Sequence, residues 1–205
     1  GPNMRCIPSN HPVLEHIRTL VPPELHDAMW VGGSAACAYG RHGDVDVWIG
    51  YIDRELTIDE ERLLIRIGTA AGNLRHVESD ETIYPDQNSM MVYAGVAPDG
   101  TKFHIMQALV FMPDVLAGFD ISCHARIVRL VDDYSLLHEH WTSTNYVRIL
   151  SWHNARVTLE RAIKFARRYG DESMWTHSKT GQCAAEACRI PYVTPRVAEM
   201  LDAMQ

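Results

Sequence analysis

The stretch VGGSAACAYGRHGDVDVWI, residues 31–49, decides the fold and indicates where a functional site lies. Gly32 and Gly33 allow a sharp backbone turn, and they let the main chain approach a ligand without a Cβ atom in the way. Ser34 stands where a helix of small residues begins, and it is the expected N-cap residue. The free N–H groups at such a helix start, together with the helix dipole, suit a phosphate. We therefore expect a strand, a glycine turn and a short helix that can receive phosphate.

Two acidic residues follow on the next predicted strand. Asp44 and Asp46 are two positions apart, so both side chains leave the same face of a strand. Val45 and Val47 take the opposite face and anchor the strand in a core. Neighbouring carboxylates repel each other unless a cation lies between them, and Mg²⁺ prefers carboxylate oxygens combined with substrate phosphates. The alternative is an edge strand with two solvated aspartates, which the apolar continuation over residues 47–49 disfavours.

This pattern resembles the nucleotidyltransferase superfamily, which includes DNA polymerase beta, the CCA-adding enzymes and many small bacterial and phage transferases. The family pattern is an apolar residue, a glycine, then glycine or serine, a spacer, and two carboxylates that alternate with apolar residues. Gly33 and Ser34, the spacer 35–43 and the Asp-Val-Asp-Val sequence at 44–47 fit this pattern. The resemblance implies an α+β fold with a small mixed sheet and flanking helices.

The same resemblance implies an activity and a set of site residues. The activity is transfer of an NMP from an NTP such as ATP to an acceptor hydroxyl, with Mg²⁺ or Mn²⁺ as the cofactor. Asp44 and Asp46 are then the catalytic and metal-binding residues, and Gly32, Gly33 and Ser34 are nucleotide-binding residues.

The family usually supplies a third carboxylate from a later central strand. The matching strand is expected over residues 102–107, where His104 occupies the position of that acid between two apolar residues. His104 can bind a softer ion such as Mn²⁺ or act as a base, because imidazole titrates near neutrality. A core histidine is the structural alternative. Asp120 is another candidate for the third acid, or it orients a loop.

A basic stripe is expected on a long helix over residues 146–169. Arg161, Lys164 and Arg168 follow helical spacing, with apolar residues on the other side. Residues 160–170, ERAIKFARRYG, resemble a helix of phage-type and viral nucleotidyltransferase-like proteins. The resemblance implies that Arg161 and Lys164 contact the nucleotide or an RNA backbone, since Arg and Lys bind phosphate. RNA or tRNA is therefore the expected acceptor, ahead of a protein or a small molecule. A solvated helix face is the alternative.

The spacing of apolar residues in the rest of the chain predicts the other helices and strands. Helices are expected over residues 11–20 and 57–71, the second opened by the capping-box pair Thr57 and Glu60. Strands over 90–96 and 102–111 are expected to form a hairpin, and residues 119–130 another strand or strand pair. From residue 132 onward the pattern is helical. We therefore expect a nucleotidyltransferase-like α/β core over residues 1–131 and a helical region over 132–205.

Composition limits the classes of function. The chain has 205 residues, of which 46% are hydrophobic, and a net charge of −7, which argues against a broad DNA-coating surface but allows a local basic groove. No apolar run is long enough to span a membrane, so no membrane partner is expected. Five cysteines at irregular spacing favour a reducing, cytoplasmic setting. The oligomeric state is left open.

Two other functions remain open from the sequence. With its third acid replaced, the chain can be a catalytically silent module of the same fold that binds a nucleotide, RNA or another protein. It can also be a structural component of a phage or toxin–antitoxin system.

Overall fold

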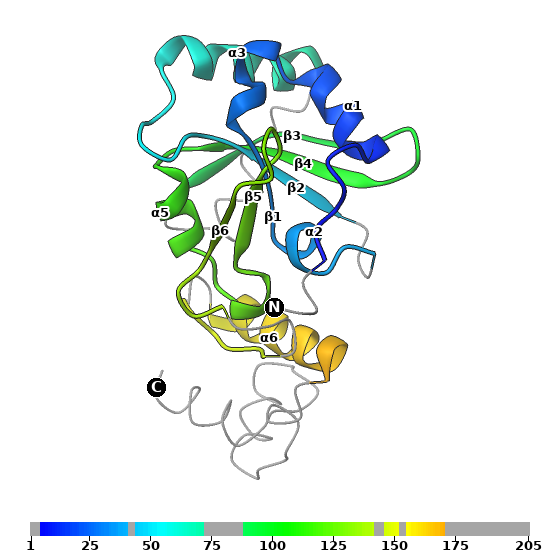
Figure 1. Cartoon of the computed structure of the whole chain (residues 1–205), viewed down its shortest axis with the longest axis vertical. Coiled ribbons are helices and arrows are strands. Elements are labelled where there is room, and N and C mark those ends of the chain that lie inside the picture. The colour runs from blue at the N-terminus through cyan, green and yellow to red at the C-terminus, as the bar shows by residue number, and fades with distance from the viewer. Residues whose placement is uncertain (1–4, 41–43, 72–87, 142–145, 152–154, 171–205) are drawn as a thin grey trace.

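The computed structural model describes residues 5–40, 44–71, 88–141, 146–151 and 155–170. Within these ranges one six-stranded sheet has the order β3-β4-β2-β1-β5-β6, shown in Figure 1. The strands are β1 (Met29–Gly32), β2 (Val45–Ile49), β3 (Ser89–Val96), β4 (Lys102–Ala108), β5 (Arg126–Arg129) and β6 (Ser135–Leu137). The helices are α1 (Pro12–Leu20), α2 (Ser34–Cys37), α3 (Ile58–Ala71), α5 (Met112–Ala117) and α6 (Ala155–Tyr169), with short 3-10 helices η1 (Pro23–Ala28) and η2 (Ser122–His124).

The neighbouring strands β2 and β4 run parallel, and every other pair of neighbouring strands is antiparallel. The sheet is therefore mixed, and helices pack on it. The expected fold class, α+β with a small mixed sheet and flanking helices, is confirmed.

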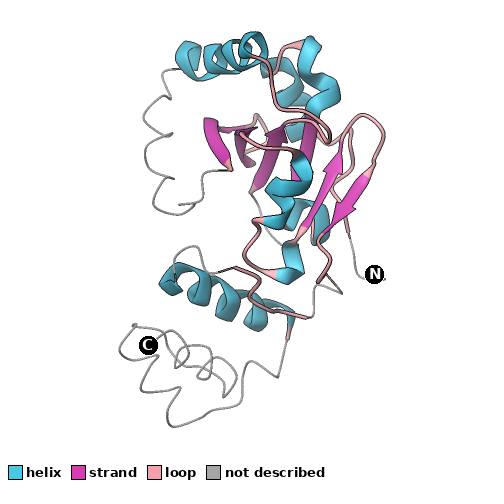
Figure 2. Ribbon diagram, turned by 90° about the vertical axis from the view of Figure 1, so that its left-hand side faces the viewer, coloured by secondary structure: helices cyan, strands magenta, loops and turns pink. Residues whose placement is uncertain are grey.

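One face of the sheet is covered by α1 and α3, as Figures 1 and 2 show. The pattern of α1 explains its place, because its apolar residues fall on one side of the helix. The helix α3 begins with the predicted capping box: the Thr57 N–H donates to Glu60 Oε1 at 2.9 Å, and the Glu60 N–H donates to Thr57 Oγ1 at 3.1 Å. The core on this face contains Val13, Leu14, Ile17, Val31, Val45, Val47, Leu64, Ile67, Phe103 and Ile105.

The opposite face of the sheet is covered in part by α5. Trp30, Trp48 and Met106 project from β1, β2 and β4 and pack with α5. The indole N–H of Trp30 donates to the carbonyl of Gly50 at 3.0 Å, so this buried ring has a partner for its polar group.

The helix α6 forms a further layer at one end of the sheet (Figure 2). It packs its apolar side on Ala38, Ile121, Cys123 and Val147. The chain between β6 and α6 is extended at Ile149, which pairs with Ile121 in an antiparallel bridge. Gly170 follows α6 with a φ of 69°, the left-handed conformation that commonly ends a helix.

Three local predictions need correction. Residues 119–130 form η2 and then β5, so the strand is confined to the end of that segment. The helical pattern expected from residue 132 is wrong at residues 135–137, which form β6 and pair with β5. The long helix begins at Ala155, because residues 146–151 are held in extended form against residues 120–122.

The expected division at residue 131 stays a prediction, and the sheet itself continues past that residue through β6. Helices expected beyond residue 170 lie outside the described residues. Among the described helices, none has both the length and the apolar character needed to cross a membrane.

Candidate nucleotide and metal site

Asp46 and His104 lie directly opposite each other on the parallel strands β2 and β4. The His104 Nδ1 atom is 2.8 Å from Asp46 Oδ1, within hydrogen-bonding distance. The side chain of His104 is 34% exposed and that of Asp46 is 39% exposed. His104 is therefore a partly open residue on the acidic face of β2, and the alternative of a core histidine does not describe it.

Small residues flank this pair in a cross-strand row. Gly32 of β1 is the register partner of Asp46, and Ala94 of β3 is the register partner of His104. Gly32 has a packing reason to lack a side chain: a Cβ atom there would lie 2.6 Å from the Trp48 ring. The row Ala94–His104–Asp46–Gly32 thus places two polar side chains between two residues that have little or no side chain.

Asp44 is exposed and directly precedes β2. Among the described residues, no group of three or more His, Cys, Asp or Glu side chains is placed to hold a metal ion by itself. Mg²⁺ is commonly bound by one or two carboxylates together with substrate phosphates, so the carboxylates of Asp44 and Asp46 have the right chemistry for it. The imidazole of His104 is a softer donor.

The glycine turn has the backbone form that its sequence indicates, but the helix α2 begins one residue earlier than predicted. Gly33 has φ 68° and ψ −140° and is the N-cap of α2, so Ser34 is the first helical residue and not the cap as expected. A Cβ atom on Gly33 would have no neighbour within 4 Å. The Gly33 N–H donates to the Arg126 carbonyl at 3.2 Å. The Gly33 N–H is therefore already engaged by the main chain of β5.

Arg126 holds α2 in place, a role that reasoning from the sequence missed. Its Nη1 donates to the Ala36 carbonyl at 2.6 Å, and its Nη2 donates to Ser135 Oγ at 2.8 Å. The available signal was a cationic residue at the start of a strand that is otherwise apolar at residues 127–128. Nothing in the sequence indicated that its partners lie on α2 and β6.

Arg161 of α6 is engaged by Asp120, the other candidate acid. Arg161 Nε donates to Asp120 Oδ2 at 3.0 Å, and Nη2 donates to Oδ1 at 3.3 Å. The Asp120 side chain is only 13% exposed. Both carboxylate oxygens accept from the same guanidinium, a geometry typical of a strong ion pair. Asp120 therefore anchors α6.

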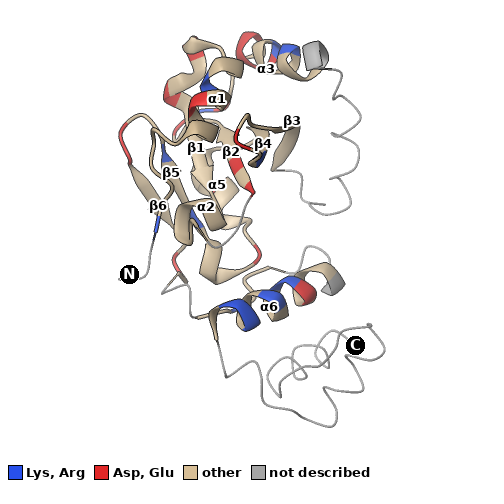
Figure 3. Cartoon of the chain, turned by 90° about the vertical axis from the view of Figure 1, so that its right-hand side faces the viewer, with Lys and Arg blue, Asp and Glu red and all other residues tan. Residues whose placement is uncertain are grey.

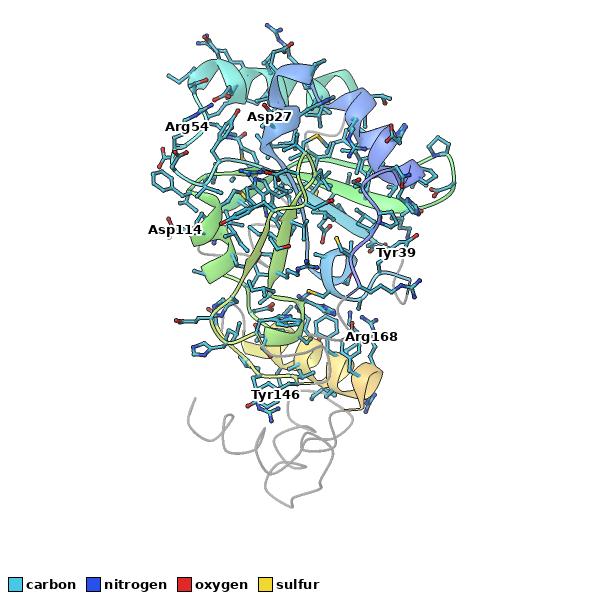
Figure 4. All side chains as sticks on the ribbon, in the orientation of Figure 1. Asp27, Tyr39, Arg54, Asp114, Tyr146 and Arg168 are labelled. Carbon is cyan, nitrogen blue, oxygen red and sulfur yellow. The ribbon has the colours of Figure 1, made fainter. Side chains whose placement is uncertain are left out.

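Lys164 lies on the exposed side of α6. Partial removal of water from its ammonium lowers the pKa of Lys164, the guanidiniums of Arg168 and Arg161 lower it further, and the carboxylate of Asp44 opposes them. Lys164 and Asp44 thus interact electrostatically although they come from different elements. In Figure 3 the acidic end of β2 and the basic part of α6 lie on the same side of the molecule, and Figure 4 shows Arg168 on the side of α6 toward α2.

No family model matches this sequence, and no curated protein matches it. The solved structures that are similar to it include two of CCA-adding enzymes. One is the Thermotoga maritima CCA-adding enzyme complexed with tRNA, at 15% identity and TM-score 0.47, covering 78% of this chain and 39% of that one. The other is an apo form of a CCA-adding enzyme, at 15% identity and TM-score 0.43, covering 77% of this chain and 38% of that one. This chain therefore spans less than two fifths of either matched chain.

Proposed function

We propose that this chain is a nucleotidyltransferase that binds an NTP with Mg²⁺ or Mn²⁺ and transfers the NMP to an acceptor hydroxyl. RNA or tRNA ranks first as the acceptor, ahead of a protein side chain or a small molecule. The observation that carries the proposal is the hydrogen-bonded, partly exposed pair of Asp46 and His104 on neighbouring parallel strands. Asp44 precedes this pair on the chain, and Lys164 lies within electrostatic reach of Asp44.

Each of these residues has a role in the proposal. Asp44 and Asp46 hold the divalent ion together with the phosphates of the nucleotide, and His104 orients Asp46 and contributes an imidazole nitrogen to the site. When bound, the ion neutralises charge on the phosphates and makes the attacking hydroxyl a better nucleophile. No closed cage of protein ligands is needed, because the nucleotide itself supplies oxygen ligands.

The glycine turn and α6 serve the phosphates in this proposal. The Ser34 hydroxyl and the first N–H groups of α2 contact the β- and γ-phosphates, and Gly33 allows their close approach. Gly32 contributes indirectly, because its lack of a side chain lets β1 and Trp48 pack together behind Asp46. Lys164 adds a positive charge opposite the carboxylates, and Arg168 extends the basic stripe toward an RNA backbone.

The second candidate is a catalytically silent module that binds a nucleotide or RNA through the same residues. The observation in its favour is His104, which stands where the resembled family has a third carboxylate. This module would bind an NTP in the presence of Mn²⁺ and transfer nothing to any acceptor.

Replacement of Asp44 tests the proposal. Wild-type protein, D44A and the control D114A are incubated with NTP labelled at the α-phosphate, Mg²⁺ or Mn²⁺, and pooled tRNA, total RNA or protein. Asp114 is a suitable control because it is an exposed acid on α5 that points outward in Figure 4. We expect D44A to lose about a thousandfold in transfer, as befits the loss of a metal ligand, while its free energy of unfolding changes by no more than about 1 kcal/mol. D114A should transfer as the wild type does.

Full transfer by D44A would show that the metal assignment is wrong. Binding of NTP by the wild type, measured by calorimetry with Mn²⁺, without transfer to any acceptor pool would favour the silent module.

A further inference from the structure

The helix α6 is fixed to one short segment of the chain, residues 120–124, at points along its length. Arg161 pairs with Asp120, and the Tyr169 hydroxyl forms a hydrogen bond with the His124 ring. Between these two anchors, apolar residues of α6 pack on Ile121 and Cys123. Because the anchors are spaced along the helix, they set both its position and its rotation about its own axis.

This rotation decides which cations face the proposed site. Residues three and four apart on a helix are surface neighbours, so Lys164 and Arg168 continue the stripe that begins at Arg161. Lys164 is exposed and interacts with the charge of Asp44. Figure 3 shows the basic part of α6 on the same side of the molecule as the acidic end of β2, so the Asp120–Arg161 pair also fixes the side of α6 on which Lys164 lies.

The ion pair with Asp120 favours the observed position of Arg161. Its guanidinium makes two hydrogen bonds to a carboxylate that is 13% exposed. If Arg161 left to contact a phosphate, the carboxylate of Asp120 would remain in a mostly buried place without its cation, which is costly. This contrasts with Asp46, whose side chain is 39% exposed and can meet a ligand.

We propose that the Asp120–Arg161 ion pair is a positioning device that holds Lys164 against the phosphates of the nucleotide, and that Arg161 is not itself a phosphate ligand. This inference rests on the proposed function and refines it, because it divides the basic stripe into a residue that positions and a residue that binds.

Asp120→Asn distinguishes a positioning role of Arg161 from a phosphate-binding role, because the two roles predict opposite changes in the affinity for a triphosphate. If the pair positions Lys164, D120N loosens α6 and weakens binding of a non-hydrolysable triphosphate by about tenfold, as expected for one hydrogen bond to a charged group. If Arg161 is a phosphate ligand, D120N releases it and strengthens binding. Calorimetry measures the affinity of each variant for the triphosphate and for the corresponding NMP. The affinity for the NMP should change little, because the NMP lacks the β- and γ-phosphates.

The coupling between Asp120 and Lys164 sharpens the test. K164M should weaken triphosphate binding by a similar factor, and the double variant D120N/K164M should bind no more weakly than K164M alone. An additional loss in the double variant would overturn the inference, because Asp120 would then act without Lys164. D132N is the matched control: Asp132 also accepts two bonds from one arginine, Arg129, but lies at the turn between β5 and β6.

A variant that keeps the charge covers the case in which D120N does not fold. D120E retains the carboxylate but places it one methylene farther from the backbone, so a positioning role predicts weaker triphosphate binding even though an ion pair persists. Triphosphate binding by D120E equal to that of the wild type would overturn the inference. If the wild type binds no triphosphate, the proposed function fails and the inference falls with it. If the wild type binds and both Asp120 variants bind equally well, only the inference fails.

Discussion

The two faces of the sheet are built from the same strands but differ in how completely they are covered. Beneath α1 and α3, residues such as Val47 and Ile105 form a closed apolar core. On the other face, Trp48 and Met106 are covered by α5, whereas the pair Asp46 and His104, two positions earlier on the same strands, stays partly exposed. Successive side chains of a strand point to opposite faces, so each strand can contribute to a closed core and to an open site at the same time. Changes to the buried and to the exposed residues of these strands should therefore affect stability and function separately.

The largest expected effect on stability comes from Gly32→Ala, at the boundary between the open and the covered parts of the second face. The new Cβ would lie 2.6 Å from the Trp48 ring and 3.0 Å from Ile127, and both neighbours are buried. Overpacking of this kind costs roughly 1–3 kcal/mol. Urea unfolding of the variant and of the wild type measures the loss.

A second substitution shows whether packing is the cause. G32A combined with W48L, compared with W48L alone, should show a smaller loss than G32A in the wild-type background, because the ring that meets the Cβ is gone. An equal loss in both backgrounds would place the effect in the backbone and not between Gly32 and Trp48.

The next effect is on function and concerns His104→Asp, which places a carboxylate opposite Asp46 on the neighbouring strand. A carboxylate is a harder ligand than imidazole, so the ratio of transfer supported by Mg²⁺ to transfer supported by Mn²⁺ should rise by about tenfold, the lower end of the effects seen when residues around a metal site are changed. Rates measured with each metal in turn give the ratio. An unchanged ratio would show that His104 is not near the ion.

The other face of β4 supplies the matched control for His104. His16 of α1 packs edge-on against Phe103, the strand neighbour of His104 that points to the closed core. H16A should leave the metal ratio unchanged. A similar shift in both histidine variants would mean that the two faces are not separable.

Period-two alternation explains why the strands β2 and β4 could be predicted. Residues 44–47 and 102–105 alternate between polar and apolar side chains, so both strands follow from the sequence, whereas the shared face of Asp44 and Asp46 stays a prediction. The position of His104 opposite Asp46 needed the parallel register, which the sequence does not contain. The Asp120–Arg161 pair joins residues 41 positions apart, and neither has a local signal that names the other.

The predictions that were wrong, for the start of α2, for β6 and for residues 146–151, can also be explained by particular residues. Ser34 has the chemistry of an N-cap, but the positive φ of Gly33 moves the start of α2 by one residue. The strand β6 spans only residues 135–137, too few to display alternation, and it exists because β5 offers a free edge for pairing. Residues 146–151 carry a helical pattern, but their backbone groups pair with residues 120–122, so tertiary contacts override the local preference.

The smallest effect concerns the closed face, where Glu60 ties the start of α3 to the segment that follows β2. The Arg54 guanidinium bonded to Glu60, helped by the Thr57 N–H and the Tyr51 hydroxyl, lowers the pKa of Glu60 from 4.5 to about 2. A lowered carboxyl pKa stabilises the fold above the ordinary value, and this contribution is lost as the pH falls from about 4.5 to about 2. Since Arg54 is nearly half exposed, solvent screens the pair and its contribution at neutral pH is small.

Glu60→Gln removes the charge but keeps a side chain that still accepts the Thr57 N–H in a capping box. E60Q should therefore be less stable than the wild type near neutral pH, and the gap should close toward about pH 2, where Glu60 becomes protonated. Urea unfolding at several pH values measures the gap, with the exposed neighbour E55Q as the control. A gap that stayed constant with pH would assign the loss to the cap and not to the ion pair. Because α3 covers the closed face, E60Q should also leave NTP binding unchanged, whereas H104D changes the metal preference at little cost in stability.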